Sequence, residues 1–285
     1  MAMTAAARGI LVLALVLAAP RLVRADEAAS HYNLGLQLKR DGKIPEAIAE
    51  CEKAIELRPD YASAHLTLGN LWRGQGNYQK AAAEFEKTVK LEPKDPTARA
   101  NLGAAYVRLK RVDDGIRELQ AAIDLKPDEY EARVSLGFAF KAKGDFPRAI
   151  EQLQKATELR PNDPQAWTNL GVTKSKADDK DGAIFALRRA ISLRPDDSGL
   201  HFDLAVVFRR QRDTEAAIAE YKLALGYNPK MAGAYYDLGV LYSQLKKDDD
   251  AKAAFQKYLE VAPGDDAASR KDAEERLKSY GLKKK

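Results

Sequence analysis

The 285-residue chain has few of the residues that carry cross-linking, catalytic or membrane-spanning chemistry. Its one cysteine, Cys51, allows no disulfide within the chain, so stability has to come from packing. It has three histidines and two tryptophans. Its only long apolar run is residues 10–19 (ILVLALVLAA), about half the length of a helix that crosses a bilayer. No later segment is apolar enough to span a membrane.

The apolar run lies within a stretch ordered like an export signal. A free amino terminus and Arg8 precede the run, and the small-residue site VRA at residues 23–25 follows it. We therefore expect residues 1–25 to be a signal peptide, Asp26 to begin the mature chain, and the protein to reach the bacterial periplasm. Arginines are unusual beside a cleavage site, so an uncleaved N-terminal membrane anchor is the alternative.

An excess of charge of one sign is also missing from the body of the chain. The formal net charge is +5, but three arginines lie in residues 1–25 and three lysines lie in the basic tail, residues 282–285. The remaining residues therefore carry a net charge of −1. Nucleic-acid binding needs a basic field concentrated on one folded face. We expect no nucleic-acid partner.

What the chain has in abundance is repetition, with a period of 34 residues. Counted in units that start at residue 28, position 32 is proline each time: Pro59, Pro93, Pro127, Pro161, Pro195, Pro229 and Pro263. Position 7 is always leucine: Leu34, Leu68, Leu102, Leu136, Leu170, Leu204 and Leu238. A sequence that repeats in phase over so many units predicts one structural unit copied along the chain.

Each unit has the pattern of two amphipathic helices. Apolar residues fall at positions 4, 7, 8 and 11 and again at 20, 24 and 27, which is helical spacing. Small residues at positions 8 and 20 would let the two helices approach closely, and Gly42, Gly76 and Gly144 would supply turns. The proline ends the second helix. Aspartates after it are expected to cap the next helix: Asp60, Asp95, Asp128, Asp163, Asp197 and Asp265.

This unit resembles the tetratricopeptide repeat (TPR) family, with Leu-Gly at positions 7 and 8, alanine at 20 and 27, and proline at 32. The resemblance covers seven units: residues 28–61, 62–95, 96–129, 130–163, 164–197, 198–231 and 232–265. It implies an all-α, right-handed superhelical solenoid whose first helices line a concave groove. Residues 266–281 are charged apart from a thin stripe of Ala273, Leu277 and Tyr280, which predicts a C-terminal capping helix.

The residue inventory argues against an enzyme. His31, His65 and His201 all occupy position 4, where other units have Trp167 or Tyr235, so we interpret them as substitutes for a packed aromatic ring. No glycine-rich phosphate loop follows a predicted strand. We expect no catalytic residue, no metal and no cofactor.

The resemblance implies that positions 2, 5, 6, 9, 12 and 13 of each first helix face the groove. An asparagine there offers a donor and an acceptor to one peptide unit, as in family members that hold extended peptides. The polar candidates are Asn33, Asn70, Asn101, Ser135 and Asn169. The apolar candidates are Phe138, Phe202 and Tyr236. A basic margin is formed by Arg40, Arg73, Arg108, Lys141 and Arg209.

These features predict an exported, non-enzymatic scaffold that binds an extended segment of a partner protein in its groove. The basic margin favours a segment with acidic side chains or a free carboxylate. Family members that clamp the carboxyl terminus of chaperones use lysine at position 5, which no unit has here, so that ligand is disfavoured. Envelope proteins of this family often assist the assembly of outer-membrane or pilus machinery. The alternatives are a self-assembling structural protein, as a homo-oligomer, and a substrate-positioning subunit of an envelope enzyme.

Overall fold

A computed structural model describes residues 26–263 and 266–282. Within these ranges the ordered elements are helices, and no strand occurs. The chain divides into two compact units, Met1–Gly144 and Asp145–Lys285, and each is described by itself. The expected signal peptide and the last three residues of the expected basic tail lie outside the described residues. No helix in the described part is both long enough and apolar enough to cross a membrane.

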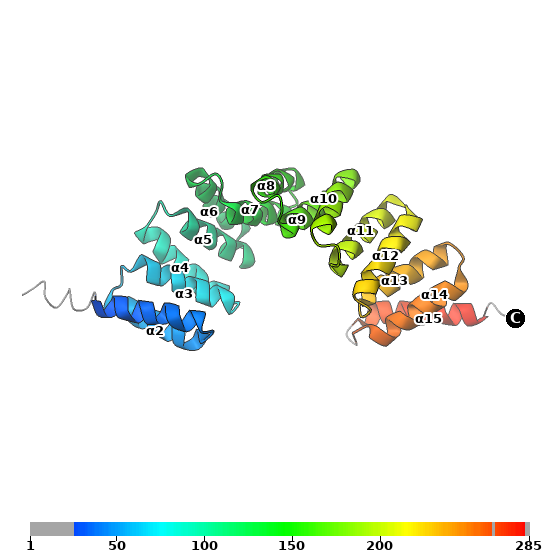
Figure 1. The fold of residues 1–285 in the computed structure, drawn as a ribbon, viewed down its shortest axis with the longest axis horizontal. Helices are drawn as coiled ribbons and strands as arrows, with labels where there is room; N and C mark the ends of the chain where they lie inside the picture. The colour runs from blue at the N-terminus through cyan, green and yellow to red at the C-terminus, as the bar shows by residue number, and fades with distance from the viewer. Residues whose placement is uncertain (1–25, 264–265, 283–285) are drawn as a thin grey trace, which may run out of the picture. The chain divides into compact units, whose positions relative to one another are not determined.

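The first unit is a stack of antiparallel helix pairs (Figure 1). Residues 26–40 are helical, and they are followed by α2 (Ile44–Leu57), α3 (Ala62–Gly74), α4 (Tyr78–Leu91), α5 (Pro96–Arg108), α6 (Val112–Leu125) and α7 (Tyr130–Ala142). We call α3, α5 and α7 the A helices of this unit, and α2, α4 and α6 its B helices. Each A helix contacts the next, α3 with α5 and α5 with α7, so the A helices form one layer.

The second unit continues the same alternation (Figure 1). Its helices are α8 (Phe146–Leu159), α9 (Pro164–Lys176), α10 (Lys180–Leu193), α11 (Ser198–Gln211), α12 (Thr214–Tyr227), α13 (Ala232–Gln244), α14 (Asp248–Val261) and α15 (Ala267–Leu282). Its A helices are α9, α11 and α13. The predicted all-α tetratricopeptide solenoid with a C-terminal helix is confirmed.

The turn inside each helix pair uses a left-handed residue at a fixed place. Three are the glycines expected there, with φ between +74° and +76°. The same position in other pairs is held by Lys110, Asp178, Arg212 and Lys246, with φ between 56° and 64°. A left-handed conformation is costly for a residue with a Cβ atom. The turn is therefore dictated by the packing of the two helices, even where glycine is absent.

Two of the predicted helix caps are wrong by one residue. Asp95, Asp163 and Asp197 each accept a hydrogen bond from the backbone N–H two residues later, as an N-cap should. The helices α3 and α7 instead have Tyr61 and Glu129 at the N-cap, and neither side chain accepts such a bond. The reason is position: Asp60 and Asp128 come one residue too early to reach the first turn.

Small residues bring the two helices of a pair into backbone contact. A Cβ atom placed on Gly103 of α5 would lie 2.6 Å from Leu119 Cγ and 2.9 Å from the backbone oxygen of Gly115. A Cβ on Gly115 would lie 2.9 Å from the backbone oxygen of Gly103. Real Cβ atoms do not approach this closely. The small residues at positions 8 and 20 are thus required where α5 meets α6.

The histidines at position 4 are polar links, which corrects their interpretation as simple packing residues. His65 Nε2 donates to the carbonyl oxygen of Pro59 at 2.9 Å, and its Nδ1 lies 2.6 Å from a carboxylate oxygen of Glu84. His201 has the same two kinds of partner, Pro195 and Glu220. The rings of His65 and His201 therefore each tie the preceding turn to the second helix of their own pair, while His31, among the described residues, hydrogen-bonds only to Glu50 of the second helix.

Other residues at position 4 make the same link with different chemistry. Arg99 donates to the Pro93 carbonyl at 2.9 Å and to Glu118 at 2.7 Å. Trp167 has one N–H, which donates to the Pro161 carbonyl at 2.8 Å. In this helix pair Ala186 occupies the position of the glutamate. The tryptophan therefore has no second N–H to donate, and the second helix has no carboxylate to accept one.

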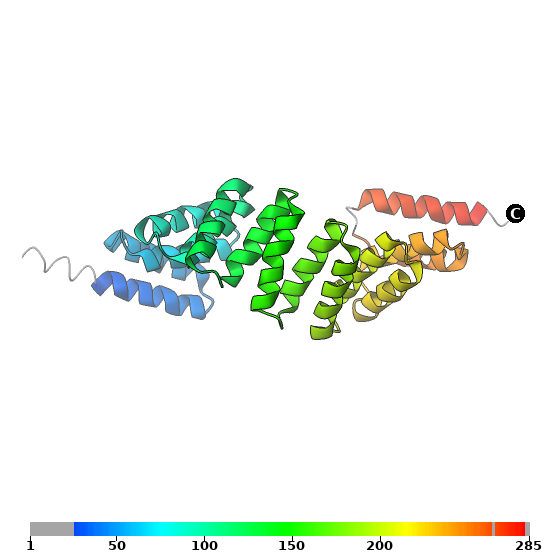
Figure 2. The same cartoon turned by 90° about the horizontal axis from the view of Figure 1, so that it is seen from above.

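The C-terminal helix α15 covers the end of the second unit (Figure 2). Ala273 and Tyr280 of the predicted stripe are buried, and Leu277 packs beside them. The hydroxyl of Tyr258 donates to Asp266, and the hydroxyl of Tyr236 donates to Asp272. These contacts cover a flank of α13 and α14 that would otherwise be exposed to solvent. The helix α15 runs through Leu282, one residue beyond the predicted end.

Candidate functional site

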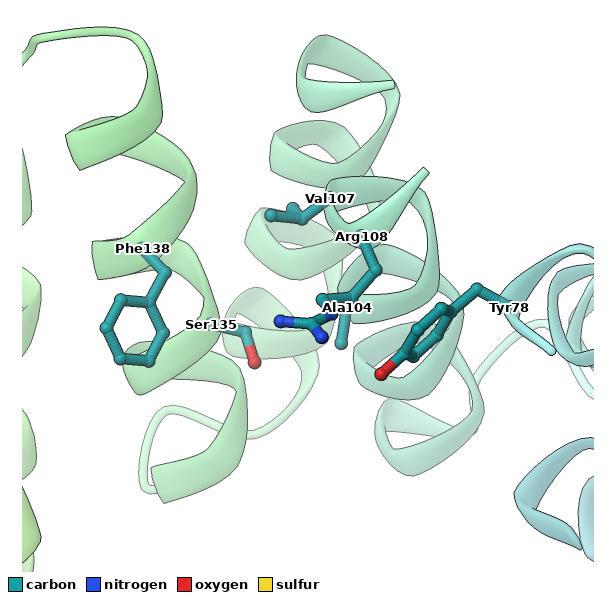
Figure 3. A pocket seen from close by; sticks show the side chains of 6 residues that line it. All are labelled: Tyr78, Ala104, Val107, Arg108, Ser135 and Phe138. Atoms are coloured by element: carbon teal, nitrogen blue, oxygen red, sulfur yellow. The ribbon is translucent and has the colours of Figure 1, made fainter. Parts of the chain in front are cut away.

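The A-helix layer of the first unit contains a hollow of about 520 Å³. It is lined by Ala104, Val107 and Arg108 of α5, Ser135 and Phe138 of α7, and Tyr78 at the start of α4 (Figure 3). Three of the predicted groove residues, Arg108, Ser135 and Phe138, therefore come together. The other three lining residues were not predicted. Tyr78 was missed because it belongs to a second helix, which the resemblance places away from the groove.

The hollow has two aromatic walls and a cation between them. Figure 3 shows the rings of Phe138 and Tyr78 on opposite sides, with the Arg108 guanidinium and the Ser135 hydroxyl between. The guanidinium carbon of Arg108 lies 5.0 Å from the centre of the Tyr78 ring. The Lys141 ammonium lies 4.5 Å from the centre of the Phe138 ring. Because no acidic residue lines the hollow, it suits an apolar group with a negative charge beside it.

The polar residues of α3 and α5 extend this face. Arg73 donates to the side-chain carbonyl of Asn101 at 2.9 Å, which uses the acceptor of Asn101 and leaves its amide donors without a partner in the described part. Asn70, one turn before Arg73 on α3, has a buried side-chain oxygen that accepts no hydrogen bond there. Because the Asn70 oxygen is buried, it is not presented to a ligand, whereas the amide donors of Asn101 can bind a peptide carbonyl.

The remaining predicted residues of the first unit lie at its edge. Asn33 and Arg40 are exposed on the helix of residues 26–40, and Lys141 is half-buried on α7. Among the described residues of this unit, Arg108 differs from Arg73 because it donates to no side-chain oxygen.

In the second unit most of the predicted residues contact the protein itself. Asn169 accepts a hydrogen bond from Gln165, and Arg209 lies 3.5 Å from Asp237. The Phe202 ring packs edge-on against Tyr221, with the ring centres 5.5 Å apart. Tyr236 likewise packs on Phe255 and Tyr258 and donates to α15. These two rings were predicted to face a ligand, and the structure shows them against internal partners.

A carboxyl group that the prediction omitted lies on the A-helix layer of this unit. Asp203 occupies position 6 of α11, the position of the asparagines, and no described residue donates a hydrogen bond to it. Burial, with the nearby Asp197, raises the pKa of Asp203 to about 6. The sequence contained a signal for it, namely aspartate at a position where other units have asparagine.

The described residues offer little for covalent or metal chemistry. They contain no group of three or more histidine, cysteine and acidic side chains placed to hold a metal ion. Cys51 is fully buried, and burial raises the pKa of its thiol to about 11. A thiol in that state is protonated at neutral pH and is a poor nucleophile.

Family models agree with the geometry of the helix pairs. A model described as tetratricopeptide repeat matches residues 32–96, 66–130 and 173–232, which is more than half of the chain. The chain belongs to the tetratricopeptide repeat family. Related models match residues 139–177 and 208–275. No curated protein matches the sequence.

Solved tetratricopeptide repeat structures share the fold at low sequence identity. The C-terminal part of a TPR protein from Cytophaga hutchinsonii is 18% identical with a TM-score of 0.68, over 86% of this chain and 99% of that one. PilW, described as a type IV pilus biogenesis factor, is 19% identical with a TM-score of 0.65, over 71% and 94%. YrrB, described as having an unusual peptide-binding site, is 20% identical with a TM-score of 0.55, over 69% and 97%. At these identities the likeness concerns the fold.

Proposed function

We propose that this TPR protein is a non-enzymatic scaffold that binds an extended segment of a partner protein on its A-helix layer. The hollow between α5 and α7 is the observation that carries the proposal, because it gathers two aromatic rings and a cation on that layer. The unused amide donors of Asn101 add hydrogen-bonding capacity for a peptide backbone. YrrB is described as having an unusual peptide-binding site and PilW as a type IV pilus biogenesis factor, and a related role would fit this chain.

The second part of the proposal is that the protein is exported to the bacterial periplasm. We also propose that the mature chain contains seven repeats. The support for export is the order of charges and apolar residues in residues 1–25. Fractionation of the host followed by N-terminal sequencing tests it: Asp26 should be the first residue of a periplasmic protein. An intact leader in the membrane fraction would indicate the anchored alternative, and an intact cytoplasmic chain would contradict export.

Peptide selection tests the binding function. A phage-displayed library of random peptides is selected on the purified protein, and the enriched peptides are synthesised and titrated by fluorescence polarisation. Ser135→Arg should weaken binding by about tenfold or more, since the larger side chain fills the hollow and adds a buried charge.

Ala83→Arg is the matched control for that substitution. Ala83 is exposed on the B helix α4, outside the A-helix layer, so this variant should bind like the unmodified protein. Equal loss in both variants, or no loss in either, would contradict binding at the proposed face.

A further inference from the structure

We infer that the hollow selects a partner segment in which an aromatic side chain lies next to a side-chain carboxylate. This inference rests on the proposed function and specifies its ligand. The aromatic side chain would enter between Tyr78 and Phe138, and the carboxylate would pair with Arg108.

The state of Arg108 sets it apart from the arginines of the first unit that already have a side-chain partner. Arg99 pairs with Glu118, Arg111 and Arg117 pair with Asp114, and Arg73 donates to Asn101. Arg108 is exposed and lies over the Tyr78 ring, and no described residue forms a hydrogen bond or an ion pair with its side chain. A guanidinium held over a ring, with its N–H groups unused, can bind a carboxylate through two parallel hydrogen bonds.

The rest of the lining explains why a lone acidic group is insufficient. Ala104, Val107 and the two rings present apolar surface to the hollow, and an apolar side chain is needed to cover it. Aromatic rings prefer edge-on or offset contacts with other rings, which the two facing rings can offer to a phenylalanine or tyrosine. The ligand should therefore combine both groups at short spacing.

The carboxylate is assigned to a side chain and not to a chain terminus. The hollow lies between two consecutive A helices, and the polar groups of Arg73 and Asn101 continue the same face on α3 and α5. A segment that uses all of these groups must extend past the hollow. An internal acidic residue meets that requirement.

Short synthetic peptides with acetylated and amidated ends test the inference by fluorescence polarisation. One carries Phe-Ala-Glu in an alanine and serine background, and its relatives carry Phe-Ala-Gln, Ala-Ala-Glu or Phe-Ala-Lys. A further peptide ends in Phe-Ala with an unblocked carboxylate. We expect Phe-Ala-Glu to bind about tenfold more tightly than Phe-Ala-Gln, as for a charged hydrogen-bonded pair, and Ala-Ala-Glu to bind about as weakly.

Arginine variants show whether the discrimination comes from this site. Arg108→Gln should remove the preference for glutamate over glutamine, while Arg117→Gln, on the B helix α6, should retain it. Arg117 is suited as a control because its side chain is 70% exposed and lies outside the hollow. Circular dichroism melting checks that both variants are folded.

The outcomes separate the two proposals. If peptides bind and Ser135→Arg abolishes binding, but glutamate and glutamine peptides bind equally, the carboxylate assignment is overturned and the binding function stands. Preference for the unblocked terminus overturns the side-chain assignment. If neither these peptides nor any library peptide binds the unmodified protein, both proposals fail.

Discussion

At the scale of single residues, Asp203 on α11 occupies position 6 of its repeat, the position of Asn33, Asn101 and Asn169 in other repeats. Burial, followed by the charge of Asp197, raises the pKa of Asp203 from 3.8 to about 6. Between these two values the folded chain holds a proton that the unfolded chain has lost. The contribution of Asp203 to stability therefore falls as the pH rises through this window, and it is unfavourable above it.

Replacing Asp203 by asparagine should therefore stabilise the protein at pH 8 and leave its stability nearly unchanged at pH 4. A pKa change of one unit corresponds to about 1.4 kcal/mol, and partial exposure to solvent reduces the effect, so we expect a gain of about 1–2 kcal/mol. Urea denaturation at the two pH values measures it. The control is Asp249→Asn, because the Asp249 side chain is 96% exposed. Equal gains at both pH values would show that the carboxyl group is not penalised by burial.

Also at this scale, the sequence indicated which residues occupy position 4 but not what they do. The ring of His65 reaches two partners at once, because Nε2 donates to the Pro59 carbonyl and Nδ1 lies 2.6 Å from a carboxylate oxygen of Glu84. Burial opposes the charge of Glu84, but hydrogen bonds from His65 and Lys87 lower its pKa overall. This role depends on a proline carbonyl and a glutamate that only folding brings to the same ring.

At the scale of helices, the pair α5 and α6 depends on the absence of side chains where the two backbones meet. Gly103→Ala should destabilise the protein by about 1–3 kcal/mol, since the new methyl group would press on the backbone oxygen of Gly115 as well as on Leu119. The measurement is the free energy of unfolding in urea.

The same substitution at an open position should have the opposite sign. Gly226, near the end of α12, has no atom within 4 Å of an added Cβ. Gly226→Ala should therefore stabilise the protein by up to about 1 kcal/mol, because alanine favours the helix. Destabilisation of similar size in both variants would mean that close backbone contact is not what the glycine at position 8 provides.

The positions of the helices could be predicted because the pattern repeats. Where the helix boundaries are unclear in one repeat, the same positions in the other repeats indicate them. The A helices from α3 to α7 begin at residues 62, 96 and 130, which is the sequence period. The turns at Lys110 and Arg212 were less evident, because their left-handed backbone is imposed by helix packing and not by a glycine.

At the scale of the whole molecule, repetition specifies the scaffold, and the proposed site depends on residues that differ from one repeat to the next. The family pattern placed Arg73, at position 12, and Arg108, at position 13, in one basic margin. The structure distinguishes them, because Arg73 donates to Asn101 while Arg108 lies over Tyr78 beside the hollow. Whether a charged side chain is already paired depends on its neighbours in adjacent helices, which a single sequence does not specify.

The face of the molecule that binds a partner is the central claim, and photo-crosslinking tests it most directly. A photoreactive phenylalanine analogue is placed either at Lys141, on α7 beside the hollow, or at Ala83, on the B helix α4. Each protein is irradiated with a library-selected peptide, and the adducts are measured by mass spectrometry. We predict adducts from position 141 that excess unlabelled peptide suppresses, and none from position 83. Adducts from position 83 alone would contradict the account.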